Sequence, residues 1–377
     1  MDISSGEHAL IPASPRDFAD AVLHLLRDDS LWEKLSLNGL ALAERLYSYD
    51  RVAERFHRML SDIGVPVRNS RDADESRVAP LPIPITVLPN SSVHIVSCTS
   101  QDEYHLTVDK RDPTSRLAQE QHVVDYRPFS IPGYCRVCGS PSRFEIDYIN
   151  GSERTNGLTI PNWRETFTCR KCRLNCRTRA SIDLWTSRFS PRREHSVYLT
   201  EQATPLYQWI TRAYTQTVGS EYLGNTVSQG DVDQCGLRNE SLLRLTFPDS
   251  SFEWILSFDV LEHIPDYSQA LQECFRTLKP GGVLLFTVPF LRESEETVVR
   301  ARVDARGQIE HILPPEYHGD PMNSAGCLCF YHFGWDLLDA LKEVGFTECF
   351  AHFVWSDDIC VYLGEKQVVF SGRRASH

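Results

Sequence analysis

The sequence lacks any run of about eighteen apolar residues, so we expect no membrane-spanning helix. Its first residues contain no basic segment followed by an apolar one, so we also expect no secretory signal. Basic charge is scarce as well: 39 Lys and Arg stand against 51 Asp and Glu, a net charge of −12. This balance argues against nonspecific binding to nucleic acid, and no specific nucleic-acid partner is predicted. These absences together predict a cytoplasmic protein without a membrane span.

Cysteine is also too sparse for a disulfide scaffold, since the chain has 12 cysteines in 377 residues. Without a secretory signal, these cysteines are expected to be thiols and metal ligands. The remaining composition, 41% hydrophobic and 24% charged, is ordinary for globular protein, and the length suits two or three domains.

A strand, a helix and a second strand follow one another between residues 252 and 290. Residues 252–258 form a short apolar run of strand formers, and residues 267–278 place apolar side chains on one helical face. Lys279-Pro-Gly-Gly282 ends that helix, and a second apolar run follows at 283–290. This order predicts a βαβ unit in a parallel sheet. Asp259, Glu262 and His263 come directly after the first strand, at the sheet edge where α/β proteins bind ligands.

Three motifs in this region resemble class I S-adenosylmethionine-dependent methyltransferases of the methyltransferase type 11 group. They are Phe247-Pro-Asp-Ser-Ser-Phe252, Asp259-Val-Leu-Glu-His-Ile-Pro265 and Leu278-Lys-Pro-Gly-Gly282, in the order and spacing of that family. The resemblance covers roughly residues 196–374. It implies an α/β, Rossmann-like fold, with a mostly parallel sheet and helices on both faces, and S-adenosylmethionine as cofactor.

The glycine-rich turn that this family usually carries after its first strand is missing. Glu201 lies about where the first glycine would be, after a strand predicted from residue 196. Glycine is normally found there because it lets the backbone approach the cofactor closely. Glu201 either faces the amino group of the methionine moiety or blocks the pocket.

The resemblance implies further cofactor-binding residues. Glu221 follows Glu201 by twenty residues, the spacing expected of the acid that accepts hydrogen bonds from the ribose hydroxyls. Glu240 and Ser241 are alternatives for a contact with the adenine amino group. The predicted cofactor-binding set is Glu201, Glu221, Tyr222, Glu240, Ser241, Asp259 and Val260.

A long insertion, residues 291–333, separates the second strand from the last helix and strands. Loops of this length in a compact domain are usually functional or disordered, and interleaved aromatics, histidines and prolines argue against disorder. We interpret the insertion as a lid over the methyl acceptor. If the acceptor is a hydroxyl, a base must remove its proton, and His263 or His318 is the candidate.

Two cysteine pairs, Cys135-Arg-Val-Cys138 and Cys169-Arg-Lys-Cys172, are separated by roughly thirty residues. Each pair sets two thiolates on one tight turn, and two such turns complete a tetrahedral, structural zinc site. Gly139 suits the turn after the first pair, and Cys176 could replace Cys172 as a ligand. Residues 143–149 and 163–168 are predicted strands. The segment resembles zinc ribbons that precede methyltransferase domains, although four unligated cysteines or a redox pair would carry the same pattern.

The first 130 residues are less informative. Residues 14–63 predict three short helices, with Ser14 as a cap, and loosely resemble the C-terminal helices of a GT-B glycosyltransferase. No nucleotide-sugar site accompanies them, so a small helical bundle without sugar transfer is the simpler interpretation. A glycosyltransferase partner or fusion parent would suit the resemblance. Charge and proline in 65–130 suit a linker, within which residues 85–88 and 93–96 could be short strands.

These patterns predict four parts: residues 1–64, a helical segment; 65–130, a linker; 131–190, a zinc-ribbon-like module; and 191–377, a methyltransferase domain. The expected function is methyl transfer from S-adenosylmethionine to a small molecule or glycan. The alternative is an inactive methyltransferase-like scaffold with a structural zinc ion, favoured by the missing glycine turn.

Overall fold

The computed structural model describes residues 14–25, 28, 31, 34, 35, 38, 93–109, 127–155, 158–320, 322–356 and 361–376. The chain forms two compact units, Met1–Pro84 and Ile85–His377. In the first unit, α1 (Pro15–Leu25) begins as predicted, because the Ser14 hydroxyl accepts a hydrogen bond from the amide of Asp17 at 3.2 Å. The rest of the predicted N-terminal helices lies largely outside the described residues.

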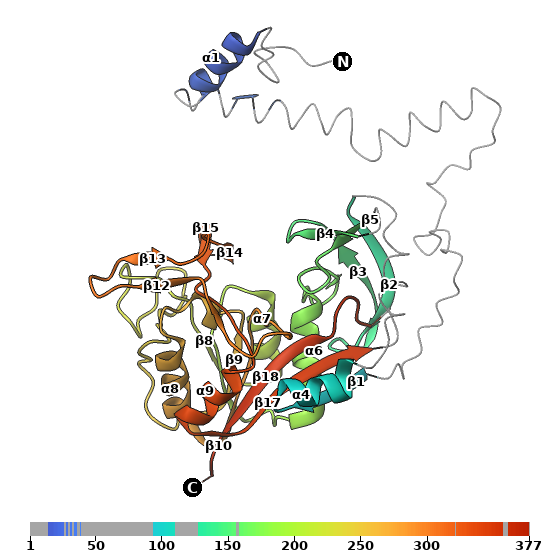
Figure 1. Ribbon diagram of the computed structural model, residues 1–377, viewed down its shortest axis with the longest axis vertical. Coiled ribbons are helices and arrows are strands. Elements are labelled where there is room, and N and C mark those ends of the chain that lie inside the picture. The colour runs from blue at the N-terminus through green and yellow to red at the C-terminus, as the bar shows by residue number, and fades with distance from the viewer. Residues whose placement is uncertain are drawn as a thin grey trace, which may run out of the picture. The chain divides into compact units, whose positions relative to one another are not determined.

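A seven-stranded sheet organises the second unit (Figure 1). Its neighbours β8, β7, β9 and β10 are parallel, whereas β18 is antiparallel to both β10 and β17, and β1 is antiparallel to β17. The sheet is therefore mixed, and the prediction of a mostly parallel sheet holds only for its β8–β10 half. The strands in spatial order are β1 (Val93–Cys98), β17 (Phe346–Ser356), β18 (Gln367–Arg374), β10 (Leu278–Thr287), β9 (Phe252–Phe258), β7 (Ser196–Leu199) and β8 (Gln216–Gly219).

Helices cover both faces of this sheet, as expected. Along β7, Val197 and Leu199 share one hydrophobic cluster with α6 (Cys176–Leu184) and α7 (Pro205–Ala213). Tyr198, which points to the opposite face because strand side chains alternate, belongs to a second cluster. That cluster contains residues of α4 (Gln101–Tyr104), α8 (Tyr267–Thr277) and α9 (Leu337–Val344). Strands buried on both faces explain the continuous apolar runs in the sequence.

The predicted βαβ unit is present. Strand β9 leads through the short helix η4 (Leu261–His263) into α8, and β10 then pairs with β9 in parallel. Helix α8 ends at Thr277, and Lys279-Pro-Gly-Gly282 forms an irregularity in β10 between Leu278 and Val283. Proline and glycine thus end the helix, as the sequence indicates, without ending the strand.

Residues 93–109 fall in the segment predicted as a linker but form part of the sheet unit. Strand β1 pairs with β17 over six residues, and Tyr104 of α4 packs on Phe353 with ring centroids 4.7 Å apart. The π-helix η2 (His105–Asp109) continues α4. The apolar side chains of 93–98 find a partner strand more than 250 residues away, which local composition cannot reveal.

The cysteine segment folds as small β-structures around α6. Its strands are β2 (Phe129–Cys135), β3 (Ser140–Ile146), β4 (Ser152–Thr155), β5 (Leu158–Pro161) and β6 (Thr168–Cys169). The strand predicted at 163–168 is wrong, because the amides of Glu165 and Thr166 both bond to the Asn162 carbonyl and close a turn. Residues of this segment share one core with the sheet, so the segment and the sheet are one compact unit.

The insertion at 291–333 consists of short antiparallel pairs. They are β11 (Val298–Val299) with β16 (Tyr331–His332), β12 (Ala301–Val303) with β13 (Ile309–His311), and β14 (Tyr317–Asp320) with β15 (Asn323–Leu328). None of the helices in the described part of the chain has the length and apolar character needed to cross a bilayer.

Candidate functional site

A cavity of about 1800 Å³ opens where the parallel strands end. From β7 the chain passes to β8 on one side and then to β9 on the other, so β7 marks the point where strand order reverses. Ligands of open α/β sheets bind at such a point, outside the carboxyl ends of the strands. The cavity walls come from the β7–α7 loop, the ends of β8 and β9, the insertion and the cysteine segment.

Glu221 lies just past β8 and faces the loop that follows β7. Its Oε1 accepts hydrogen bonds from the amides of Gln202 and Ala203, both at 2.7 Å. The residue is 9% exposed and lines the cavity, beside the 69% exposed ring of Tyr222. Glu221 therefore presents a carboxylate on the cavity wall and holds the β7–α7 loop, while its contact with a ribose stays a prediction.

The glycine that brings these two loops together is Gly219, at the end of β8. A Cβ atom there would lie 2.8 Å from the carbonyl oxygen of Glu201 and 2.5 Å from the Tyr207 ring. Such contacts are too short for any other residue without a backbone shift. Gly219 thus lets the end of β8 lie directly against the β7–α7 loop.

Glu201 lines the cavity directly after β7. Burial raises the pKa of its carboxyl to about 7, against opposing contributions from Thr204 and Arg177. A group with this pKa is only partly ionised near neutral pH. Only its ionised form can attract the amino group of a bound methionine moiety.

Asp259, at the end of β9, is held by two arginines from the cysteine segment. The guanidinium nitrogens of Arg164 lie 2.6 and 2.7 Å from its oxygens, and Nε of Arg177 lies at 3.2 Å. The Thr287 hydroxyl donates a third contact at 2.7 Å. Burial alone would raise the pKa of Asp259, but the two guanidinium groups hold it well below its usual range. Asp259 is thus a permanent anion on the cavity wall.

Sequence reasoning named neither Arg164 nor Arg177 as a residue of this site. The guanidinium of Arg177 bonds to Glu165 at 3.0 and 3.1 Å, and both arginines line the cavity. The contact of Arg164 with Asp259 joins residues 95 positions apart. No local sequence signal marks such a pair.

Glu240, Ser241 and Val260 also line the cavity. The Glu240 carboxylate is already occupied: Arg238 lies 2.8 Å away, and Thr246 donates from its hydroxyl at 2.5 Å and its amide at 2.9 Å. Of the two alternatives for the adenine contact, Ser241 is therefore better placed to accept a new donor.

The two histidines predicted as bases lie side by side. The rings of His263 and His318 are 5.0 Å apart and nearly perpendicular, and both residues line the cavity. Glu262, named by the sequence only as part of a polar cluster, lies behind them with no exposed side-chain surface. Burial, with a further contribution from Asp259, raises the pKa of Glu262 well above its usual value.

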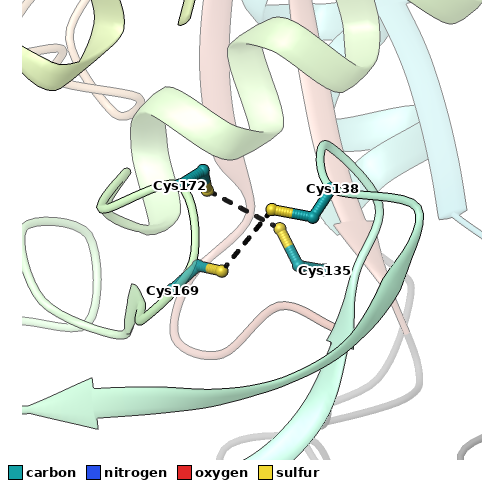
Figure 2. A group of neighbouring side chains, drawn as sticks. All are labelled: Cys135, Cys138, Cys169 and Cys172. Carbon is teal, nitrogen blue, oxygen red and sulfur yellow. Dashed lines mark hydrogen bonds between the residues drawn. The ribbon is translucent and has the colours of Figure 1, made fainter.

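The four cysteines form a separate cluster (Figure 2). Sγ of Cys135 lies 3.8 Å from Sγ of Cys172, and Sγ of Cys138 lies 3.9 Å from Sγ of Cys169. All four sulfur atoms lie within 4.8 Å of one another. A zinc ion with bonds of roughly 2.3 Å to four thiolates separates them by about 3.8 Å. The residues therefore fit a tetrahedral zinc ion, with the sulfur atoms from two facing turns directed at one point.

Both turns use a left-handed residue after the second cysteine: Gly139 has φ +60° and Arg173 has φ +62°. The alternative ligand Cys176 is wrong. It begins α6, is fully buried, and directs its thiol at the carbonyl oxygen of Leu363 at 3.6 Å. Cys172, not Cys176, completes the cluster.

Residues 206–286 match the family model of a methyltransferase domain. The match runs from α7 to β10 and includes Glu221, Asp259 and Glu262. A Mycolicibacterium smegmatis protein described as a probable S-adenosylmethionine-dependent methyltransferase is 36% identical over 76 residues, 20% of this chain and 30% of that protein. Demethylmenaquinone methyltransferase of Listeria monocytogenes is 40% identical over 58 residues, 15% of this chain and 24% of that protein. The chain thus spans less than a third of each relative.

Solved structures give a similar but weaker likeness. An S-adenosylmethionine-dependent methyltransferase from Mesorhizobium loti is 15% identical, with a TM-score of 0.31 over 51% of this chain and 97% of that one. The 1,6-didemethyltoxoflavin-N1-methyltransferase of Burkholderia thailandensis is 16% identical, with a TM-score of 0.31 over 52% and 76%. At these scores the likenesses add nothing about substrate.

Proposed function

We propose that this protein is an S-adenosylmethionine-dependent methyltransferase. The observation that carries the proposal is Glu221, a carboxylate past the second strand of a parallel β8–β7–β9–β10 set, on the wall of the cavity and beside an exposed aromatic ring. A carboxylate there suits a ribose diol, since each oxygen accepts hydrogen bonds.

The cavity offers a complement for several parts of the cofactor. Glu221 would accept from the ribose hydroxyls, Tyr222 would lie against the adenine, and Ser241 would meet its amino group. At the other end, ionised Glu201 suits the ammonium group of the methionine moiety and lines the same cavity. These donor and acceptor types support S-adenosylmethionine as the ligand.

When bound, S-adenosylmethionine supplies a methyl group on a sulfonium ion, whose carbon–sulfur bond breaks with the electron pair returning to sulfur. The chain contributes position and exclusion of water, which account for much of the acceleration of such a transfer. Asp259 fixes Arg164 and Arg177, so the end of β9 is pre-arranged. His263 and His318 are the side chains in reach of a hydroxyl acceptor that could remove its proton.

The cavity volume, about 1800 Å³, exceeds the 300–1,000 Å³ typical of a single small-molecule site. It would therefore accommodate the cofactor together with a second molecule beneath the insertion. We propose a small molecule or a glycan as acceptor. The four cysteines would hold a zinc ion that is structural, because a four-thiolate site leaves no position open to substrate.

Isothermal titration of the full-length protein with S-adenosylmethionine and with S-adenosylhomocysteine tests the proposal. Both should bind at one equivalent per chain, and ATP, which shares the adenosine but lacks the amino-acid end, should bind at least tenfold more weakly. Absence of binding in the wild type, together with binding in a Glu201→Gly variant, would overturn the enzyme and establish the inactive scaffold.

A further inference from the structure

Glu262 is a buried carboxylate that the proposed methyl transfer does not use. It comes from η4, directly after β9, and has no exposed side-chain surface. Within the described ranges, neither carboxylate oxygen has a hydrogen-bond partner on another residue. The ion-pair partners found for it there are two histidines, His263 and His318. A buried carboxylate in this state is unfavourable unless a cation or a proton pairs with it.

The hydrogen bonds of the two histidines determine which nitrogen of each ring carries the hydrogen and which nitrogen presents a lone pair to Glu262. Nδ1 of His263 lies 2.9 Å from the carbonyl oxygen of Leu328, which can only accept, so Nδ1 carries the hydrogen. Nε2 of His318 lies 2.9 Å from Glu316, a carboxylate, so Nε2 carries it there. In the neutral rings, Nε2 of His263 and Nδ1 of His318 are therefore acceptors.

Three acceptor atoms thus meet at one place. Nε2 of His263 lies 3.7 Å, and Nδ1 of His318 lies 3.8 Å, from the same Oε1 of Glu262. A hydrogen bond needs about 2.7–3.2 Å, so a proton does not bridge these pairs. A metal ion bonded at roughly 2.0–2.2 Å to each atom does span such separations. All three ligand atoms lie within 4.8 Å of one another.

The outer partners of the histidines are those that metal-binding histidines use, a backbone carbonyl and a carboxylate. Glu316 is itself fully engaged, with Nε2 of His332 at 3.0 Å and Arg300 at 3.1 Å, in addition to His318. Glu316 therefore orients His318 and does not compete with Glu262 for an ion.

We propose that Glu262, His263 and His318 bind a divalent transition-metal ion. Two imidazoles and one carboxylate suit Zn²⁺, Mn²⁺, Fe²⁺ or Co²⁺ better than Ca²⁺ or Mg²⁺. The histidines line the cavity, whereas Glu262 lies behind them, so the remaining positions of the ion face the cavity. Three protein ligands with an open side is the arrangement of a catalytic site, in contrast to the closed cysteine cluster.

This inference rests on the proposed function and narrows its acceptor. An ion with open positions lowers the pKa of a hydroxyl that binds to it. The acceptor class is therefore a compound with a hydroxyl group, delivered to the methyl group from beneath the insertion. The two histidines then act through the ion rather than as a direct base.

Manganese is the probe, because the four thiolates of the cysteine cluster disfavour this harder ion. Mn²⁺ is titrated into full-length protein from which a mild chelator has removed weakly held ions while the cysteine cluster keeps its zinc, and the bound Mn²⁺ is counted by electron paramagnetic resonance. The expected result is one bound equivalent per chain, weakened at least tenfold in Glu262→Gln and in His318→Gln. His318 lies in the insertion, so its variant should keep the sheet even if Glu262→Gln does not. His311→Gln, an exposed histidine of the same insertion, should bind like the wild type.

Zinc analysis is a second measurement of the same site. The wild type should hold two equivalents of zinc per chain, and Glu262→Gln should hold one. Failure to bind Mn²⁺ together with a single zinc in the wild type would overturn the site, as would Mn²⁺ binding that both variants leave unchanged. S-adenosylmethionine affinity is measured in the same samples, which retain the zinc of the cysteine cluster, before Mn²⁺ is added. If the protein binds S-adenosylmethionine but not Mn²⁺, the metal site is refuted and the methyltransferase proposal stands. If it binds Mn²⁺ but not S-adenosylmethionine, the methyltransferase proposal is refuted and the metal site stands.

Discussion

The two clusters that could hold metal ions differ in what surrounds them. The four sulfur atoms of Cys135, Cys138, Cys169 and Cys172 face one another from two tight turns, and their geometry closes the site. Glu262 and its two histidines meet from a strand end and an insertion, with one side on a cavity. A cluster whose residues fill every coordination position of an ion stabilises the fold. A cluster that leaves coordination positions open beside a cavity is a site for binding a ligand. Changes in the first should reduce folding, and changes in the second should reduce ligand affinity.

The largest effect is expected from Cys135→Ser. Structural zinc contributes about 10–16 kcal/mol of apparent binding free energy, as much as the net stability of a typical domain. The variant should lose its zinc and much of its folded structure, as measured by metal analysis and circular dichroism. Cys235→Ser changes an exposed cysteine outside the cluster and should retain both. Zinc content and thermal unfolding equal to the wild type in Cys135→Ser would contradict a structural metal.

Next in size is Asp259→Ala, at the contact between the cysteine segment and the cavity. Removing this carboxylate leaves Arg164 and Arg177 with Glu165 as their remaining shared partner, so the free energy of unfolding should fall by about 1–3 kcal/mol. Asp249→Ala is the matched control, because Asp249 pairs with Arg276 at an exposed position and should cost about 0–1 kcal/mol. Denaturant titration compares them. Equal midpoints would mean that the segment and the sheet are not joined through Asp259.

A smaller effect concerns pH and Glu201. Because its folded pKa is raised to about 7, the folded state holds this proton more tightly than the unfolded state, so Glu201 makes stability fall as pH rises from about 4.5 to 7. The affinity for the cofactor should instead rise as pH rises. The anion that attracts the cofactor's ammonium group forms above pH 7, so affinity should fall by up to tenfold per unit below that pH.

Glu201→Gln is the control for this pH dependence. Titrations from pH 5.5 to about 7.5 stay below the pKa of roughly 7.7–8.0 of an α-amino group, so the cofactor keeps its charge. The variant should bind S-adenosylmethionine with little change across this range. A slope that persists in Glu201→Gln would assign the titration to another group.

The smallest effect is expected from changing the left-handed residue in each of the two cysteine turns. Gly139 and Arg173 occupy equivalent left-handed positions, which cost a non-glycine residue roughly 1–2 kcal/mol. Gly139→Ala should lose about 1 kcal/mol, because no atom lies within 4 Å of the added Cβ and only the backbone is strained. Arg173→Gly should gain a similar amount. Thermal unfolding measures both, and shifts in the same direction would show that these turns are not equivalent.

Much of this molecule follows from local sequence. The apolar run of β9, the Pro-Gly-Gly break after α8 and the two C-x-x-C turns all act over a few residues, and each was predictable. The partnership of β1 with β17 and that of Arg164 with Asp259 were not, because each joins segments far apart in the chain. Glu221 was singled out by spacing, but its hydrogen bonds to the β7–α7 loop depend on the turn that brings Gln202 and Ala203 to it.

The measurement that tests the central claim most directly is the affinity for S-adenosylmethionine of Glu221→Ala against the wild type. Two charge-assisted hydrogen bonds, each worth roughly 1.5–3 kcal/mol when buried and less when in contact with water, predict a loss of about tenfold to a thousandfold. Glu221→Gln keeps an acceptor for the loop amides and separates loss of charge from loss of the loop, while Glu194→Ala, at an exposed position, should bind like the wild type. Unchanged affinity in Glu221→Ala, with the protein folded, would contradict a cofactor bound at the end of β8.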